Sequence, residues 1–243
     1  MFTVTLIGPD GVGKTTVAKE LEATFKLPTK YIYMGMNVEA SNVMLPTTRW
    51  WETRKKDKGI TGHDMSRTII ESTTSVQNEP VGEDITTPPT SLRKSLVRKI
   101  RKSVGLGNRI LEEWYRQFVA WTYVKRGVIV IYDRHFIYDY YHDDIHPSDQ
   151  AISLKRKIHG FVLKHTLREP DLLICLDAPG EVVFARKGEF TPEFMEMRRH
   201  QYLELQHIVK NCRIIDATEP LETVVDKAKE ALFQFSQDRK QNG

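Results

Sequence analysis

The residues best suited to chemistry lie near the N-terminus, in the run Gly8-Pro9-Asp10-Gly11-Val12-Gly13-Lys14-Thr15-Thr16, which reads G-x-x-x-x-G-K-T. Glycines let the backbone turn tightly, so that successive N–H groups point at a polyphosphate, and the positive end of a following helix adds to that field. In this pattern the lysine reaches the β- and γ-phosphates and the threonine hydroxyl ligates Mg²⁺. The run therefore predicts a nucleotide-phosphate site, with Lys14 on the phosphates and Thr15 on the metal.

The segments around this run support the prediction. The apolar stretch from Phe2 to Ile7 is typical of a buried strand, and Val17, Ala18 and Leu21 follow at helical spacing. Strand, glycine loop and helix form the context in which the pattern binds phosphate, whereas a plain glycine-rich turn is the alternative.

A second chemical group follows the apolar run Val128-Ile129-Val130-Ile131-Tyr132, which predicts a buried strand. Asp133 comes directly after it and is the predicted magnesium carboxylate. Arg134 is a candidate clamp for an anionic acceptor, with a surface salt bridge as the alternative. In parallel sheets, ligands bind beyond the carboxyl ends of the strands, so Asp177 and Asp216, which follow two later strands, are expected at the same edge.

The segment Arg186-Lys187-Gly188-Glu189-Phe190 interrupts two helical runs. Basic residues on a mobile lid could neutralise the charge that develops on a transferred phosphoryl group. A simple helix–helix turn explains the same spacing equally well.

The remaining pattern predicts an α/β fold with a parallel five-stranded sheet and helices on both faces. A second strand is expected at Lys30–Met34, and later strands at 172–176 and 213–215, with helices near 149–168, 180–187, 192–210 and 220–236. Between the second and third strands lies a polar insertion at about 38–106, of which 52–91 is predicted to be a long or partly ordered loop.

Two helices are expected around the end of this insertion. A basic amphipathic helix over 92–104 is interpreted first as a solvated face, with contact to a membrane surface, RNA or an anionic substrate as alternatives. A second helix from Asn108 to Arg126 is expected to end at Gly127 and to bury one apolar side, formed by Ile110, Leu111, Trp114, Tyr115, Phe118 and Trp121.

Length, charge and composition limit the number of domains, the partners and the location. With 243 residues and a net charge of +4, a single domain over 1–243 is the simplest organisation, nucleic acid is an unlikely partner, and a homodimer is left open. Cys175 and Cys212 are expected to be buried thiols in a reducing compartment. No apolar run approaches the ~20 residues that span a bilayer, and no signal peptide is recognised, so a cytoplasmic location is expected.

Several of these segments together resemble the thymidylate kinase family of P-loop nucleoside monophosphate kinases. The resemblance rests on Gly8–Thr16, on Lys125–His135, on Leu176-Asp177-Ala178-Pro179-Gly180-Glu181-Val182 with Arg186, on Arg199–Tyr202 and on Ile215–Leu221. These pieces occur in family order over the N-terminal fifth and the C-terminal half of the chain. The segment after the second strand, Met34-Gly35-Met36-Asn37, differs from the Arg-Glu-Pro-Gly-Gly-like acceptor segment of the family.

The resemblance implies ATP as donor, Mg²⁺ as cofactor and a small phosphorylated acceptor, with dTMP as the expected substrate. The ATP-binding set would be Asp10, Gly11, Val12, Gly13, Lys14, Thr15, Thr16 and Arg186, with Arg186 against the adenine and Asp10 also near the acceptor sugar. Thr15 and Asp133 would hold the metal, and Lys14, Arg186 and Lys187 would act in catalysis. Because Gly11 stands where some members carry a loop arginine, charge neutralisation would fall to the lid.

The acceptor site stays open at this point. Arg49, Arg109, Arg116 and Arg134 are candidates for the missing acceptor clamp, and Arg116 and Arg134 are favoured. No carboxylate base follows the second strand, which favours an ionised phosphate as acceptor over a hydroxyl. The alternatives are a kinase of a non-nucleotide acceptor such as a sugar phosphate, and a nucleotide-dependent binding switch that uses the basic 92–104 helix.

Overall fold

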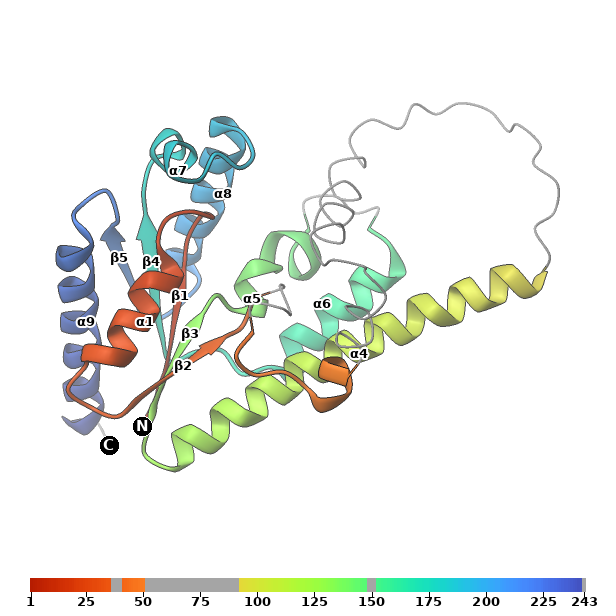
Figure 1. The fold of residues 1–243 in the computed structure, drawn as a ribbon, viewed down its shortest axis with the longest axis horizontal. Helices are drawn as coiled ribbons and strands as arrows, with labels where there is room; N and C mark the ends of the chain where they lie inside the picture. Colours follow the sequence, from red (N-terminus) through yellow and green to blue (C-terminus); the bar gives the residue numbers. More distant parts are fainter. Residues whose placement is uncertain (36–40, 51–91, 148–151, 242–243) are drawn as a thin grey trace.

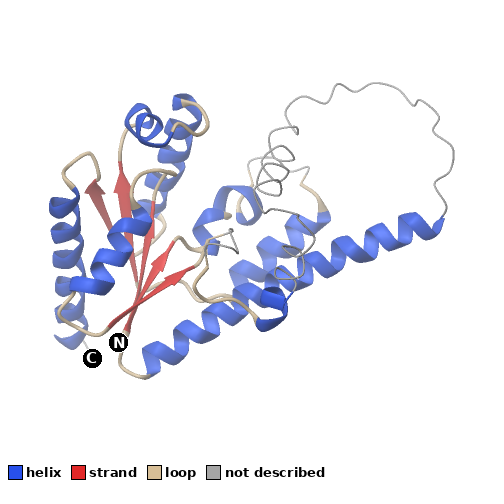
Figure 2. Ribbon diagram, viewed as in Figure 1, coloured by secondary structure: helices blue, strands red, loops and turns tan. Residues whose placement is uncertain are grey.

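The computed structural model describes residues 1–35, 41–50, 92–147 and 152–241, with the backbone alone described over 92–105. Within these residues one sheet of five parallel strands runs in the order β2-β3-β1-β4-β5. The strands are β1 (Thr3–Ile7), β2 (Thr29–Tyr33), β3 (Ile129–Asp133), β4 (Leu172–Asp177) and β5 (Cys212–Asp216). Figures 1 and 2 show helices packed against both sides of this sheet, as predicted.

Both faces of the central strands are buried because their sequences are nearly continuous apolar runs. On one face, Leu6, Ile131 and Ile174 join a core that includes helices α1 (Lys14–Thr24) and α9 (Leu221–Gln241). On the other face, Tyr132 and Leu173 join a second core. That core includes residues of α4 (Leu92–Lys125), α5 (Phe136–Asp139) and α6 (Leu154–Thr166).

The remaining elements of the described residues all follow β3 in the chain. They are a π-helical turn (Tyr141–Ile145), α7 (Gly180–Lys187), α8 (Pro192–Glu204) and a 3-10 turn (Leu205–His207). Helix α8 begins where the Thr191 hydroxyl accepts a hydrogen bond from the Phe194 N–H at 3.3 Å, which caps the helix. The short α5 and the π-helical turn after β3 were not predicted.

Helix α4 corrects two predictions. It is one continuous helix and not two separate ones, because glycine weakens a helix by only about 1 kcal/mol relative to alanine and keeps its N–H. Residues 92–106, at the end of the predicted insertion, belong to α4. Residues 46–50 form a helical turn, whereas 52–91 and the side chains of 92–104 lie outside what the structure describes.

The apolar side of α4 was predicted to be buried, and this prediction was wrong. Leu111, Trp114, Phe118 and Trp121 are 43 to 58 % exposed. The opposite face of the helix, which packs inward, carries the buried charged side chains of Glu112, Glu113 and Arg116. Arg116 pairs with Glu112 and donates to backbone carbonyls, and Glu113 pairs with His159. The buried charges on this side of the helix therefore have partners.

Cys175 is buried, Cys212 is partly buried, and both are free thiols. Among the described residues, no helix is both long enough and apolar enough to cross a bilayer.

Candidate active site

The phosphate loop connects β1 to α1 at the carboxyl edge of the sheet (Figure 1). Gly8 has φ +139°, and a Cβ there would lie 2.3 Å from the backbone oxygen of Leu176 at the end of β4. Gly11 has φ +95°, and its Cβ would press on Lys187 and Val183 of α7 at 3.2 to 3.3 Å. Glycine at both positions therefore allows the loop to lie directly against β4 and α7.

Lys14 folds back beneath this loop. Its Nζ donates hydrogen bonds to the carbonyl oxygens of Gly8 and Pro9, both at 2.7 Å, and lies 3.5 Å from Asp10 Oδ1. Burial, with Arg134 nearby, lowers the pKa of Lys14 to about 8. The ammonium is thus held by loop carbonyls at the place where phosphate oxygens are expected to bind.

The side chains of Thr15, in the first turn of α1, and Asp133, at the end of β3, are in contact. The Thr15 hydroxyl donates to Asp133 Oδ2 at 2.6 Å, and the Tyr31 hydroxyl of β2 donates to the same oxygen at 3.0 Å. Asp133 is fully buried, and its Oδ1 has no hydrogen-bond partner among the described residues. A hydroxyl beside a carboxylate with a spare buried oxygen fits Mg²⁺, which prefers oxygen ligands and shares its shell with substrate phosphates and water. When bound, this ion would help neutralise the charge on a transferring phosphoryl group.

No group of three or more His, Cys, Asp or Glu side chains that could hold a metal occurs in the described part of the chain. The Thr15–Asp133 pair supplies two oxygen atoms, and a Mg²⁺ ion held by one or two protein oxygens takes its other ligands from substrate phosphates and water.

Arg134 contacts Asp10 immediately next to Lys14. Its guanidinium forms an ion pair with Asp10 Oδ1, and its backbone has φ +68°, a conformation that costs about 1–3 kcal/mol for a residue other than glycine. Hydrogen bonds to Thr5 and Leu6 of β1, both at 3.1 Å, hold that backbone in place. Burial would raise the pKa of Asp10, but Lys14 and Arg134 outweigh it and hold the pKa far below its usual range. Arg134 thus lies at the predicted place, but it is paired within the chain.

Arg116 is buried on α4 and is also engaged within the chain. Its guanidinium donates to Glu112 at 3.1 Å and to the carbonyl oxygens of Tyr33 and Gly35 at 3.4 and 3.0 Å. The arginine ties the segment after β2 to α4, beside the predicted acceptor region. Arg109 packs on the Tyr140 ring at 4.3 Å.

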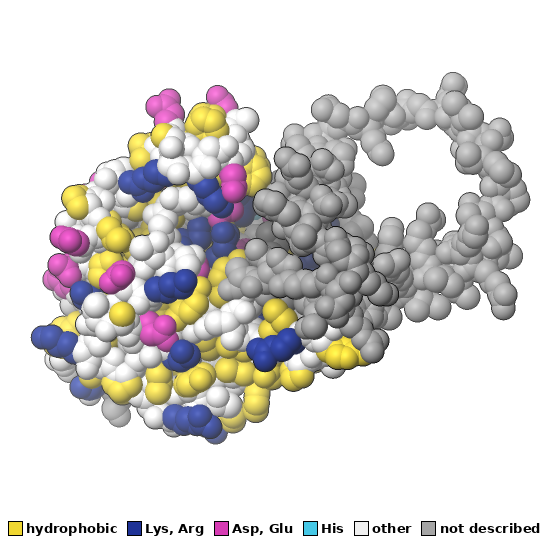
Figure 3. Space-filling view, viewed as in Figure 1, with side chains coloured by type: hydrophobic (Ala, Val, Ile, Leu, Met, Phe, Trp, Pro, Cys, Tyr) yellow, Lys and Arg dark blue, Asp and Glu magenta, His cyan; other side chains and the backbone are white. Residues whose placement is uncertain are grey.

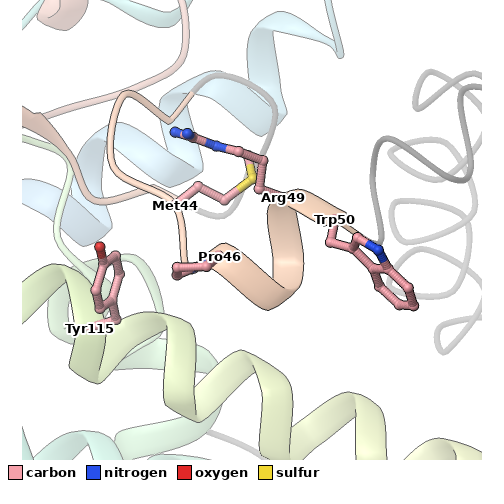
Figure 4. A pocket seen from close by; sticks show the side chains of 5 residues that line it. All are labelled: Met44, Pro46, Arg49, Trp50 and Tyr115. Carbon is pink, nitrogen blue, oxygen red and sulfur yellow. The ribbon is translucent and has the colours of Figure 1, made fainter.

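A pocket of about 420 Å³ lies between the helical turn at 46–50 and α4. Its described lining consists of Met44, Pro46, Arg49, Trp50 and Tyr115. Figure 4 shows the Arg49 side chain extending over the space above Pro46, with the Tyr115 ring across from it on α4. Of the four arginines considered for an acceptor anion, Arg49 lines this pocket.

Asp139 is a site residue that sequence reasoning missed. It lies at the end of α5, is 5 % exposed, and accepts a hydrogen bond from the Tyr202 hydroxyl at 3.1 Å through Oδ1. Its Oδ2 has no hydrogen-bond partner within the described residues. Burial raises the pKa of Asp139 although Arg134 and Lys14 act against the rise. The available signal was an acidic residue six positions after Asp133, inside an otherwise aromatic and apolar stretch.

The predicted lid is the turn between α7 and α8. Arg186 donates to the carbonyl oxygen of Ala217 at 2.9 Å, beside the end of β5, and Lys187 pairs with Glu189 at 2.8 Å. Figure 3 shows Lys and Arg side chains gathered on the face of the molecule below these two helices. The turn itself is confirmed, and its closing motion stays a prediction.

Asp177 and Asp216 are register partners at the same edge, as expected. Arg199 of α8 binds the Asp177 carboxylate with two hydrogen bonds at 2.6 and 2.9 Å, and Asp216 accepts from Thr218. Both carboxylates therefore have structural partners within the chain.

No model of a known protein family matches the sequence, and no curated protein matches it either. Among solved structures, the chain is similar to that of deoxyadenosine kinase from M. mycoides with the products dCMP and a flexible dCDP bound. The match has a TM-score of 0.50 and 14 % sequence identity, and it covers 96 % of this chain and 99 % of that one. Such a likeness concerns the fold, and it does not single out the thymidylate kinases. The chain shares with that structure an α/β fold, which here has five parallel strands between two layers of helices.

Proposed function

We propose that this chain is a kinase that transfers the γ-phosphoryl group of ATP to a small acceptor, with Mg²⁺ as cofactor. The observation that carries the proposal is the hydrogen bond from Thr15 to Asp133 next to Lys14. The second carboxylate oxygen of Asp133 is buried and has no hydrogen-bond partner among the described residues. In phosphoryl transfer the protein contributes mainly positioning and charge neutralisation, and a hydroxyl, a carboxylate and an ammonium at one loop supply both.

On the donor side, the loop N–H groups and Lys14 would bind the β- and γ-phosphates, and Thr15 with Asp133 would hold the metal. Arg186 would lie against the adenine. Its hydrogen bond to the Ala217 carbonyl supports this role, because it holds the guanidinium beside the end of β5. Lys187 would act from the α7–α8 turn, close to Gly11 of the loop.

For the acceptor, the resemblance of the sequence to thymidylate kinases favours dTMP, with Asp10 and Arg134 near the acceptor. An ionised phosphate oxygen needs no general base. Arg49 lines the pocket of about 420 Å³ and would bind the acceptor phosphate through its guanidinium. The sequence had favoured Arg116 and Arg134 over Arg49 for this role.

A second candidate acceptor is the hydroxyl group of a nucleoside, and Asp139 supports it. Arg116 and Arg134 are both engaged within the chain, whereas Asp139 offers a carboxylate oxygen without a partner in the described residues. In this reaction the acceptor O–H proton moves to Asp139, the acceptor oxygen bonds to the γ-phosphorus, and the bond from phosphorus to the leaving ADP oxygen breaks. The solved structure with the similar fold is, by its name, a kinase of a deoxynucleoside.

The test is an acceptor panel with purified protein, MgATP and coupled detection of ADP. The panel contains dTMP and other deoxynucleoside monophosphates, deoxynucleosides and sugar phosphates, and mass spectrometry identifies each phosphorylated product. Lys14→Ala is the matched control, since it keeps the fold but removes the ammonium from the phosphates. Rapid turnover of dTMP supports the first acceptor, and turnover of a deoxynucleoside supports the second. A folded wild-type protein that releases no more ADP than Lys14→Ala with any acceptor would contradict the kinase proposal.

A further inference from the structure

Tyr31 of β2 donates a hydrogen bond to the carboxylate that the proposed function assigns to the metal. Its hydroxyl lies 3.0 Å from Asp133 Oδ2. Strand β2 lies next to β3 at one edge of the described sheet (Figure 1). The register partner of Tyr31 is Ile131, so Asp133, two residues further along β3, is on the same face of the sheet as Tyr31. The long tyrosine side chain therefore reaches the carboxylate from the neighbouring strand.

This hydrogen bond is one of two on the same carboxylate oxygen. The Thr15 hydroxyl also donates to Asp133 Oδ2, at 2.6 Å, whereas Oδ1 is buried and has no hydrogen-bond partner among the described residues. Two donors on one oxygen restrict the rotation of the carboxylate about its Cβ–Cγ bond, and they leave Oδ1 as the oxygen available to a ligand. The carboxylate is thus oriented before any ligand binds.

The two donors differ in what else they do. Thr15 belongs to the phosphate loop and is itself assigned to the metal, so its hydroxyl serves both the ion and Asp133. Tyr31 lies outside the loop, and a tyrosine hydroxyl keeps its proton at neutral pH and so acts as a donor. Tyr31 therefore orients Asp133 without itself being a metal ligand in the proposed site.

Tyr31 is itself held in place. Its side chain is 7 % exposed and packs in the core that includes α1. Glu22 of α1 accepts from the Tyr31 N–H at 3.0 Å, and the Asn42 side-chain amide donates to the Tyr31 carbonyl oxygen at 2.7 Å. Supporting contacts of this kind keep a side chain in one geometry beside a functional group. The hydroxyl is therefore supplied by a packed strand and arrives at Asp133 with little freedom to move.

We infer that Tyr31 is a positioning residue for the metal site, which orients the Asp133 carboxylate and keeps its Oδ1 available to the ion. The inference rests on the proposed function, because it takes Asp133 as the residue that holds Mg²⁺. Hydrogen bonds to a ligating group tune its affinity for metal, and loss of such a partner typically lowers the affinity about 10–100-fold. A tyrosine that only filled the core would affect stability and leave the metal affinity unchanged.

The experiment measures metal binding directly, with Mn²⁺ as the probe. Electron paramagnetic resonance follows the signal of free Mn²⁺ while the ion is titrated into the full chain with a non-hydrolysable ATP analogue. Tyr31→Phe keeps the ring in the core and removes the hydroxyl, and it is expected to weaken Mn²⁺ binding at least about tenfold. In the kinase assay, the Mg²⁺ concentration for half-maximal ADP release should rise by the same factor, a change that a smaller amount of folded protein does not produce.

Tyr132→Phe is the matched control. Tyr132 directly precedes Asp133 and is fully buried, but its ring packs in the core on the other face of the sheet. Loss of this hydroxyl is expected to leave Mn²⁺ binding at the wild-type level. Circular dichroism and thermal melting check the fold of each variant.

A double variant tests whether Tyr31 acts through Asp133. If it does, adding Tyr31→Phe to Asp133→Asn weakens Mn²⁺ binding by no more than about twofold beyond Asp133→Asn alone, because the group that Tyr31 orients is already lost. A further loss of about tenfold in the double variant would overturn the inference.

The titration also separates this inference from the proposed function. Equal Mn²⁺ affinity in the wild type and in Tyr31→Phe would overturn the inference and leave the proposed function standing. So would a Tyr132→Phe protein that loses as much affinity as Tyr31→Phe. A folded wild type that takes up no Mn²⁺ with the analogue would contradict the metal site itself, and with it both the proposed function and this inference.

Discussion

Replacing Asp139 by asparagine tests whether this buried carboxylate is retained for chemistry and not for stability. Asparagine keeps the oxygen that accepts from the Tyr202 hydroxyl and removes the charge. Because burial raises the pKa of Asp139, the folded state disfavours the ionised form, and each pKa unit corresponds to about 1.4 kcal/mol. At neutral pH, Asp139→Asn is therefore expected to leave the free energy of unfolding unchanged or to raise it by about 1 kcal/mol. Turnover of a hydroxyl acceptor is expected to fall at least about 100-fold.

The same substitution at Asp144 is the matched control. Asp144 is also buried, but it accepts hydrogen bonds from His159 and Arg156, both at 2.7 Å, and these partners hold its pKa below the usual value although burial acts in the opposite direction. Asp144→Asn leaves His159 without its carboxylate partner and is expected to lower the free energy of unfolding by about 3 kcal/mol. For a chain of this size, that loss lowers the melting temperature by roughly 6–12 °C.

The assays for both variants are urea unfolding followed by circular dichroism and ADP release with the acceptors of the panel. Calorimetry with MgATP checks that nucleotide affinity is unchanged in Asp139→Asn. If Asp139→Asn loses about 3 kcal/mol of stability, as Asp144→Asn is expected to, and still phosphorylates a deoxynucleoside at the wild-type rate, the assignment is wrong.

Three further predictions concern the metal, the pH dependence and the loop. Asp133→Asn is expected to raise the Mg²⁺ concentration for half-maximal ADP release at least about tenfold, and an unchanged titration would remove Asp133 from the metal site. Burial would lower the pKa of His159, but its carboxylate partners outweigh burial and raise the pKa above 6.5. The charged His159 therefore stabilises the folded protein fully below pH 6.5, and this stabilisation is lost as the pH rises through the pKa of His159 in the folded state. Urea unfolding from about pH 6 to about pH 9 should show this decline in the wild type and a flatter profile in His159→Gln. Gly8→Ala should destabilise the protein more than Gly13→Ala, since both require positive φ but only the first brings a Cβ within 2.3 Å of another backbone oxygen. Equal urea midpoints for the two glycine variants would show that the contact with Leu176 does not fix the loop.

The sheet could be predicted from the sequence because its strands are short apolar runs that end in chemical groups. The stretch Val128–Tyr132 predicts both a strand and, through the carboxyl-edge rule, the meeting of Asp133 with the phosphate loop. The loop itself follows from local glycine positions. These parts depend on neighbours in sequence, which a pattern records.

The parts that could not be predicted depend on which face of a helix meets the core. Periodicity shows that Leu111, Trp114, Phe118 and Trp121 share one side of α4, but it does not say which side packs inward. The contacts that go with the observed orientation come from residues far away in sequence: Arg116 donates to the carbonyl oxygens of Tyr33 and Gly35, and Glu113 pairs with His159. For the same reason the sequence identified arginines near the acceptor region without showing which of them are engaged within the chain.

The most direct test of the account is a calorimetric titration of MgATP into the wild-type protein and into Lys14→Ala, without acceptor. The account predicts saturable binding at one site in the wild type and affinity weaker by at least about 100-fold in the variant, because an ammonium to phosphate contact in a buried site is worth about 3 kcal/mol or more. A folded wild-type protein that takes up no MgATP, or equal affinity in the two proteins, would contradict the central claim that the loop around Lys14 binds the phosphates of ATP.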